Sequence, residues 1–125
     1  MSKTTVVLVH GAFADASSWR GVYDLLDGDE YDVLAAAIPL RGIASDASYV
    51  GAVIDQLDGP VVLVGHSYGG AVITVAGASD KVAGLVYVAG FVPDEGETIT
   101  DLQTRFPSLA MGDFLAPRPL PDGGV

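Results

Sequence analysis

The chain has 125 residues, of which 50% are hydrophobic and none is cysteine, and its formal net charge is −10 at pH 7. This length predicts a single domain that can bury a core. The acidic charge argues against binding to nucleic acid or to an anionic membrane, both of which need clustered Lys and Arg, and the lack of cysteine excludes disulfides and thiolate metal sites.

Four apolar stretches of the sequence are typical of strands that are buried on both faces. They span residues 4–10, 31–39, 60–65 and 81–90, and the second is the weakest. Unbroken runs of this kind indicate a parallel sheet. Helix-like segments alternate with these runs, and right-handed crossovers place such helices on the faces of the sheet. The sequence therefore predicts an α/β fold with an open, mostly parallel sheet and helices on both faces.

Three segments between the strands have the pattern of helices. Residues 17–26 should begin at an N-cap of Ser17 or Ser18, and their apolar face consists of Trp19, Val22, Leu25 and Leu26. Residues 46–57 should follow Ser45 or Asp46, and their apolar face consists of Val50, Val53, Ile54 and Leu57. Residues 70–79 form a helix of small side chains that can approach the sheet closely.

The character of the sequence changes after Val92. One short helix is expected between residues 93 and 106, carried by Ile99, Leu102 and Phe106. The remaining residues are rich in Pro and Gly and contain no further strand pattern.

The segment Gly65-His66-Ser67-Tyr68-Gly69 fits the nucleophile-elbow pattern G-x-S-x-G. A serine in this pattern sits on a strained turn between a strand and a helix, so that its hydroxyl projects above the sheet. Glycines two residues before and after it avoid a collision where the strand and the helix meet. We therefore expect Ser67 to have a positive φ at a strand–helix junction and to act as a nucleophile.

A phosphate-binding loop is the competing interpretation of the same glycines, because Gly65 and Gly70 have the required separation. That motif needs Lys followed by Ser or Thr where this sequence has Ala71 and Val72. We reject it for that reason.

A second motif, His10-Gly11, ends the first expected strand and opens a loop. Acyl transfer needs two N–H donors that point at the developing oxyanion. One donor would be the backbone N–H of Tyr68, directly after the nucleophile. The other would be that of Ala12, with Phe13 as the second choice.

Three stretches of the sequence, "VVLVHGAFADASSW", "VGHSYGG" and "VYVAGFVPDEGE", resemble the α/β-hydrolase superfamily. Within it, they are most similar to the small esterase and hydroxynitrile-lyase-like branch, beside the plant salicylate-ester esterases. The resemblance covers residues 4 to about 98. It implies that Ser67 attacks an ester carbonyl, that Ala12 and Tyr68 form the oxyanion hole, and that no cofactor or metal is needed.

The resemblance also implies a division of the chain. "FVPDEGE" resembles the beginning of the family's cap, the insert that covers the substrate pocket. We therefore expect residues 1–93 to be the N-terminal part of the hydrolase core and residues 94–125 to be the start of an incomplete cap.

The sequence departs from the family in its catalytic histidine. The family order is Ser, then Asp or Glu, then His, but no histidine follows Ser67. His66 should face away from the site, because neighbouring strand residues point to opposite faces, and His10 is expected to pack or hydrogen-bond under the oxyanion loop. Asp94 and Glu95 follow the last expected strand, where some hydrolases keep their acid, but they have no histidine to orient.

The leading hypothesis is a serine hydrolase, a carboxylesterase for a small apolar ester, whose isolated 125-residue chain is inactive because it lacks the histidine and the acid. The alternatives are a non-catalytic binding protein or remnant of the same fold, and a lyase or cofactor-free oxygenase on the same scaffold. The apolar run at the N-terminus is too short for a signal peptide, so a soluble, cytoplasmic protein is expected. An unfinished sheet would leave an exposed edge through which copies could associate.

Overall fold

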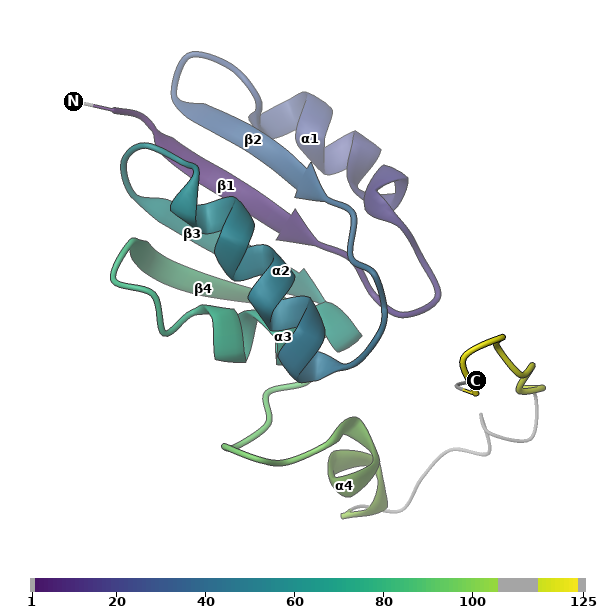
Figure 1. The fold of residues 1–125 in the computed structure, drawn as a ribbon. Coiled ribbons are helices and arrows are strands. Elements are labelled where there is room, and N and C mark those ends of the chain that lie inside the picture. The colour runs from purple at the N-terminus through teal and green to yellow at the C-terminus, as the bar shows by residue number, and fades with distance from the viewer. Residues whose placement is uncertain (1, 106–114, 124–125) are drawn as a thin grey trace.

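The computed structural model describes residues 2–105 and 115–123 and has one sheet with helices packed on it (Figure 1). The sheet has the strand order β2-β1-β3-β4. Its strands are β1 (Thr4–Val9), β2 (Tyr31–Ala36), β3 (Val61–His66) and β4 (Val82–Val88). Every pair is parallel, which confirms the predicted open parallel sheet.

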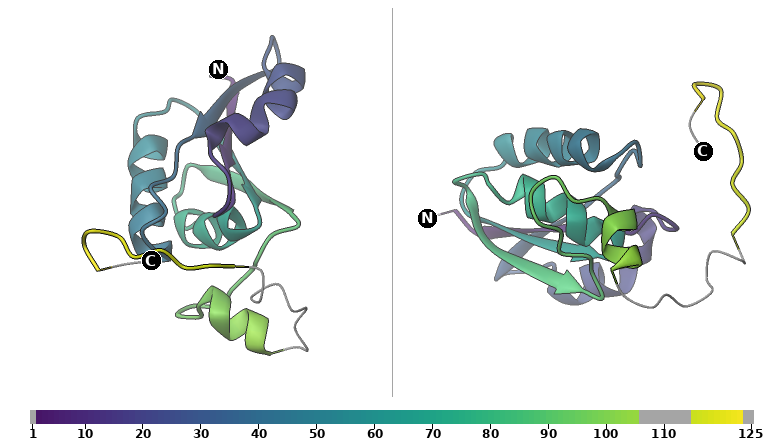
Figure 2. Two further views of the ribbon diagram at one scale, coloured as in Figure 1. Left: turned by 90° about the vertical axis from the view of Figure 1, so that its right-hand side faces the viewer. Right: turned by 90° about the horizontal axis from the view of Figure 1, so that it is seen from below.

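The helices lie on both faces of the sheet, as predicted. A 3-10 turn (Ala16–Trp19) and α1 (Arg20–Leu26) cover one face, while α2 (Ile43–Asp55) and α3 (Tyr68–Ala76) cover the other (Figure 2). Alternate residues of β1 face the two sides of the sheet in turn, because successive side chains of a strand point to opposite faces. Val7 and Val9 are buried under α2 and α3, and Val6 and Leu8 belong to the cluster on the α1 side.

The main core lies between the sheet and the helices α2 and α3. The predicted face of α2 is confirmed at Val50 and Ile54, which are fully buried, and Leu57, just after the helix, packs against the same cluster. Val53, predicted on the same face, is only half-buried. The small residues of α3 bring it close to the strands, with Val72 and Ile73 also fully buried.

The predicted apolar face of the first helix is confirmed at Trp19 and Leu26 and wrong at Val22 and Leu25. Val22 is 39% exposed and Leu25 is 87% exposed. Instead, Trp19, Tyr23 and Leu26 pack on the sheet. The helix begins with a 3-10 turn, and the i, i+4, i+7 spacing of these three residues places them on one side of the α-helix that follows.

The helix α3 (Tyr68–Ala76) begins two residues before the predicted segment 70–79, and the N-caps of the first two helices also differ from the prediction. Asp15, and neither Ser17 nor Ser18, is the N-cap of the 3-10 turn, and its carboxylate accepts a hydrogen bond from the Ser17 backbone N–H at 2.9 Å. The helix α2 begins at Ile43, after Gly42 with a φ of 137°. Neither Ser45 nor Asp46 caps it, because this earlier start places both within its first turn.

The chain leaves the sheet after β4 and forms α4 (Ile99–Thr104). A capping box begins this helix: the Thr98 hydroxyl accepts from the Asp101 N–H, and the Asp101 carboxylate accepts from the Thr98 N–H. Phe106, which was expected in this helix, lies outside the described residues. In the described C-terminal segment, Asp122 forms an ion pair of 2.8 Å with Arg41. The division of the chain between residues 93 and 94 stays a prediction.

In the part of the chain that the structure describes, no helix is long and apolar enough to cross a membrane.

Candidate active site

Ser67 lies at the junction between β3 and α3 with φ 53° and ψ −119°. The predicted positive φ is therefore confirmed. Non-glycine residues rarely adopt this backbone conformation, and they keep it only where the surroundings enforce it. The turn raises the serine above the end of β3, directly before the first turn of a helix.

Two glycines, which have no side chain, allow the turn to be this tight. A Cβ on Gly65 would lie 2.5 Å from the carbonyl oxygen of Gly69, and a Cβ on Gly69 would lie 2.3 Å from the carbonyl oxygen of Val9. Both contacts are with backbone, which cannot move aside. The absence of the second Cβ lets the start of α3 rest against the end of β1.

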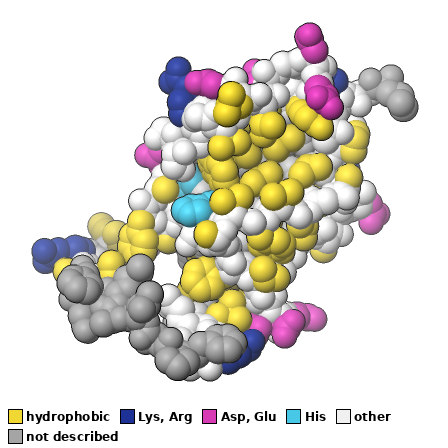
Figure 3. Space-filling model, turned by 180° about the vertical axis from the view of Figure 1, so that it is seen from behind, with side chains coloured by type: hydrophobic (Ala, Val, Ile, Leu, Met, Phe, Trp, Pro, Cys, Tyr) yellow, Lys and Arg dark blue, Asp and Glu magenta, His cyan; other side chains and the backbone are white. Residues whose placement is uncertain are grey.

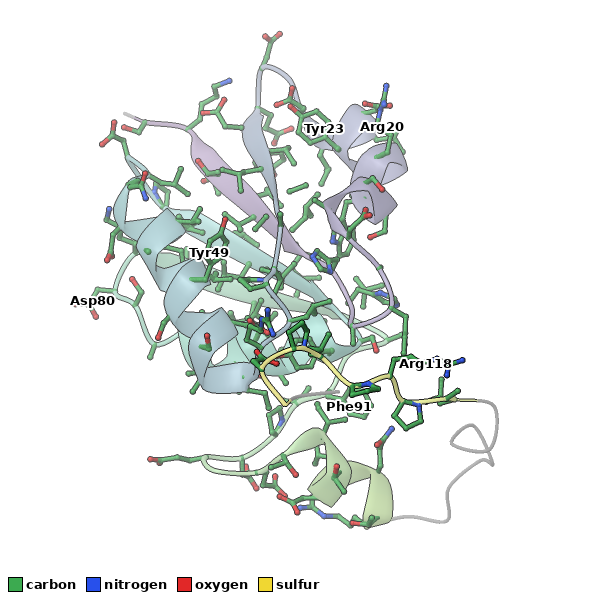
Figure 4. The ribbon with its side chains drawn as sticks, turned by 45° about the vertical axis from the view of Figure 1, so that its right-hand side comes forward. Arg20, Tyr23, Tyr49, Asp80, Phe91 and Arg118 are labelled. Carbon is green, nitrogen blue, oxygen red and sulfur yellow. The ribbon has the colours of Figure 1, made fainter. Side chains whose placement is uncertain are left out.

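The elbow is also held by backbone hydrogen bonds to the neighbouring strand. The Ser67 N–H donates to the Val88 carbonyl at 3.3 Å, and the Ser67 carbonyl accepts from the N–H groups of Gly70 at 2.9 Å and Phe91 at 3.1 Å. Phe91 lies beyond β4, where the chain continues toward α4 (Figure 4). These bonds fix the serine backbone between β4 and α3.

The loop after β1 lies beside the serine. A Cβ on Gly11 would lie 3.3 Å from the Cβ of Ser67. This loop is a turn in which the Ala14 N–H donates to the Gly11 carbonyl at 3.3 Å, and Ala12 within it is exposed. Tyr68 is the first residue of α3, where backbone N–H groups have no partner within the helix. That the N–H groups of Ala12 and Tyr68 point at the serine hydroxyl stays a prediction.

His10 is fully engaged in the structure of this loop. It is 2% exposed, its Nε2 accepts from the Ile38 N–H at 2.9 Å, and its Nδ1 lies 2.8 Å from the Gly11 carbonyl. Because Nε2 is an acceptor, the proton is on Nδ1, which donates to the carbonyl. A neutral imidazole with both nitrogens occupied supports the loop, as expected, and has no free nitrogen to take the proton of Ser67.

The side chain of His66 also adjoins the loop after β1, because a Cβ on Gly11 would lie 3.3 Å from its Nδ1. It is exposed, and its ring stands edge-on to that of Trp19, with 6.4 Å between the centroids. Trp19 belongs to the α1 side of the sheet. Asp94 and Glu95 are exposed in the turn that leads to α4. The geometry therefore presents a nucleophile and the loop beside it, with both ring nitrogens of His10 already in hydrogen bonds. That His66 faces away from the Ser67 hydroxyl stays a prediction.

The sequence prediction missed a side-chain pair at the elbow. Asp46 is fully buried in the first turn of α2. One carboxylate oxygen accepts from the Arg41 N–H at 3.1 Å, and the other accepts from the Tyr68 hydroxyl at 2.5 Å. Burial, followed by the hydrogen bond and charge of Asp46, raises the pKa of the Tyr68 phenol well above its ordinary value of 10, although a hydrogen bond from Gly42 opposes the shift. The phenol is protonated at neutral pH and donates to the carboxylate.

A signal for this pair was present in the sequence. Asp46 stands four and eight residues before Val50 and Ile54, on the stripe of α2 that faces the core. A carboxylate on such a stripe predicts a buried acceptor that needs donors. Among the described residues, no group of three or more His, Asp or Glu side chains is arranged to hold a metal ion.

Comparison with known proteins gives a family match over nearly the whole chain. A family model described as the alpha/beta hydrolase family matches residues 6–124. Methylesterase 8 of Arabidopsis thaliana is 32% identical over an alignment of 137 residues, gaps included. This alignment covers 94% of this chain and 50% of that protein. The pyrethroid hydrolase of Sphingobium wenxiniae is 32% identical over 111 residues, which cover 78% of this chain and 40% of that protein. The chain thus spans half or less of the length of these two relatives.

Solved structures have the same arrangement of elements. A crystal structure of a PytH variant superposes with a TM-score of 0.76 at 25% identity, covering 98% of this chain and 55% of that one. An extracellular alpha/beta-hydrolase from a Paenibacillus species superposes with a TM-score of 0.72 at 24% identity, covering 89% of this chain and 49% of that one. The second likeness concerns the fold alone.

Proposed function

Because the chain belongs to the alpha/beta hydrolase family, we propose that it carries the nucleophile and oxyanion hole of a serine carboxylesterase. The observation that carries the proposal is the backbone of Ser67, held at φ 53° between β3 and α3 with Gly11 against its Cβ. A plain strand–helix turn does not require a serine in a strained conformation.

The proposed reaction begins with attack of the Ser67 Oγ on the carbonyl carbon of an ester. The hydroxyl proton passes to a general base, and the carbonyl oxygen becomes an oxyanion that accepts hydrogen bonds from the N–H groups of Tyr68 and Ala12. The N-terminus of α3 adds a favourable dipole for this negative charge. Collapse of the intermediate expels the alcohol with a proton and leaves an acyl group on Ser67, which water then removes.

The general base and its acid are proposed to lie in the part of the family fold that this chain does not span. His10 has both ring nitrogens in hydrogen bonds, and His66 stands against Trp19. The relatives extend over about twice the matched length, which leaves room for both groups. Residues 94–125 are proposed to begin the cap over the substrate pocket.

The proposed substrate class is a small apolar ester. Support comes from relatives named as methylesterases and from one named as a pyrethroid hydrolase. Neither the proposed nucleophile nor the proposed oxyanion donors need a cofactor.

The proposal is tested by initial rates of p-nitrophenyl acetate hydrolysis. The 125-residue chain alone should be nearly inactive, because an oxyanion hole without a triad leaves only about a 10³- to 10⁴-fold acceleration over water. The protein at its natural length, or the short chain mixed with a separately expressed continuation, should turn over. Ser67→Ala should remove that activity in each active form, and the Ser48→Ala variant in α2 serves as a control for loss of an exposed hydroxyl.

Two outcomes would contradict this mechanism. Full activity of the short chain that disappears in His10→Ala would identify His10 as the base. Activity at natural length that survives Ser67→Ala would exclude the elbow from the mechanism. If no form hydrolyses esters, the esterase proposal fails, and the binding protein and the lyase or cofactor-free oxygenase are the two alternatives that stand.

A further inference from the structure

We propose that Asp46 is a positioning residue of the nucleophile elbow, which holds the Tyr68 side chain and thereby fixes the Tyr68 backbone N–H where the oxyanion forms. The inference rests on the proposed function, because it assigns a role to a donor of the proposed oxyanion hole. It adds a residue from another helix to the site.

The contact joins the first turns of two helices. Asp46 belongs to the first turn of α2, and Tyr68 is the first residue of α3, directly after Ser67. The carboxylate has no exposed surface, and its two oxygens accept from the Tyr68 hydroxyl and the Arg41 N–H. The N–H of Arg41 thus holds the carboxylate that in turn holds the phenol.

A carboxylate is a costly way to fill this position if packing is its only role. Val50 and Ile54 continue the same stripe of α2 into the core, and an apolar side chain at position 46 would need no donors. A buried carboxylate is tolerated only with good hydrogen bonds, and its gain is geometric specificity more than stability. The geometry that it specifies here is that of the residue following the nucleophile.

The first residue of α3 needs such a restraint. The N–H groups of a first helical turn have no partners within the helix, and Ser67 before it has a strained backbone that the surroundings must hold. An anchor at the far end of the Tyr68 ring limits rotation of the whole residue, including its N–H. The value of an oxyanion donor depends on its position to within a few tenths of an ångström.

The structure offers a matched control on the same helix. The Tyr87 hydroxyl on β4 lies 2.7 Å from the Thr74 hydroxyl on α3, which also forms a hydrogen bond to the Gly70 carbonyl. Tyr87→Phe therefore removes a phenol hydrogen bond to α3 without touching the Tyr68 side chain. A merely structural role of Asp46 predicts that Tyr68→Phe and Tyr87→Phe behave alike.

The kinetic experiment uses the protein at its natural length with p-nitrophenyl acetate. Loss of an oxyanion donor costs about 10²- to 10³-fold in kcat, so a displaced donor should cost about tenfold. We expect this loss in kcat for Tyr68→Phe and Asp46→Asn, with KM within about twofold of wild type. Tyr87→Phe should retain kcat within about twofold. Equal kcat in all four proteins would overturn the proposal.

A second measurement tests the positioning role without relying on activity. In protein labelled with 15N-tyrosine, the Tyr68 amide resonance is assigned by its disappearance in Tyr68→Phe. It should shift in Asp46→Asn and stay in place in Tyr87→Phe.

The two measurements separate failure of this inference from failure of the proposed function. If ester hydrolysis is absent or survives Ser67→Ala, the esterase proposal fails, and the amide shift still tests whether Asp46 positions the Tyr68 N–H. If hydrolysis depends on Ser67 but the Tyr68 amide does not respond to Asp46→Asn, the positioning role is wrong and the esterase stands. If Asp46→Asn does not fold, the kcat comparison of Tyr68→Phe with Tyr87→Phe decides whether the positioning role holds.

Discussion

At the scale of single residues, the elbow depends on backbone that is held under strain. A conformation such as that of Ser67 costs about 1–3 kcal/mol, and it persists because its N–H and carbonyl are bonded to Val88, Gly70 and Phe91. To keep Ser67 in this backbone conformation, α3 must also begin in contact with β1. Gly69 makes that contact possible.

Gly69→Ala should therefore weaken the fold. Its Cβ would lie 2.3 Å from the Val9 carbonyl oxygen, and relief requires a shift of the central strand or of α3. Overpacking of this kind costs about 1–3 kcal/mol or more. Thermal unfolding of the protein at its natural length, followed by circular dichroism, should show a lowered Tm.

Gly51→Ala is the matched control for this substitution. Gly51 lies inside α2, and a Cβ there would meet nothing within 4 Å. Replacing a helical glycine by alanine should stabilise the protein by about 0.5–1 kcal/mol. An unchanged Tm in Gly69→Ala would show that the elbow is not packed against β1 as described.

Part of this site could be predicted from single residues, and part could not. The positive φ of Ser67 follows from the elbow pattern alone, because that turn is local. The role of Asp46 could not be assigned, since its partner Tyr68 is 22 positions away on another helix. The sequence showed a carboxylate on an apolar stripe, but only the packing of α2 beside α3 identifies its donor.

At the scale of elements, strands were easier to predict than the starts of helices. A run such as residues 61–66 is apolar enough to be a buried strand whatever surrounds it. The start of a helix depends on which group satisfies its first N–H groups, and several nearby residues compete for that role. Asp15, and neither Ser17 nor Ser18, is the N-cap of the 3-10 turn, and α2 begins after Gly42.

The Asp15 cap should make the loop beside the elbow sensitive to acid. Hydrogen bonds from the Ser17 hydroxyl and then from its N–H lower the pKa of the Asp15 carboxyl below 3.8. A carboxyl whose pKa is lower in the folded state stabilises that state above its unfolded pKa, and this stability is lost as the pH falls through the folded pKa. The carbonyl-carbon NMR titration of Asp15 between pH 2 and 6 should show the lowered midpoint.

Asp15→Asn separates the cap from its charge. Asparagine also caps helices well, so the variant should keep the turn at neutral pH while losing this contribution to the acid dependence of Tm. Asp15→Ala should lose both. A wild-type titration midpoint at or above 3.8 would contradict the hydrogen bonds described for this carboxyl.

At the scale of the whole molecule, the two faces of the sheet are covered unequally. On the α1 side, Val64 of β3 is paired in register with Val86 of β4, and His66 is paired with Val88. Val86 is 46% exposed and Val88 is 43% exposed. Figure 3 shows hydrophobic side chains gathered over the middle of the face seen from behind. In the described part of the chain, β4 is also an edge strand of the sheet.

This unequal coverage predicts that the 125-residue chain, studied alone, is poorly stable, binds a hydrophobic dye and associates with itself. Exposed apolar surface forfeits about 25 cal/mol per Å², and an open strand edge offers backbone groups for pairing. The net charge of −10 opposes association, but repulsion between exposed charges is screened beyond about 10 Å at 0.1 M salt. Sedimentation velocity should therefore show larger species as sodium chloride is raised, with dye fluorescence present throughout.

The double variant Val86→Thr, Val88→Thr tests which surface is responsible for this association. Threonine keeps the β-branched shape that suits a strand and leaves the net charge unchanged, so only the apolar character of the face is reduced. Dye binding and salt-dependent association should both fall, whereas Leu25→Gln on α1, at a side chain 87% exposed, should change neither by much. A short chain that stays monomeric at high salt, binds no dye and unfolds cooperatively would show that this face needs no cover. Association that persists in the double variant would instead assign it to the open edge of β4, because the substitutions leave the backbone N–H and C=O groups of that edge free to pair.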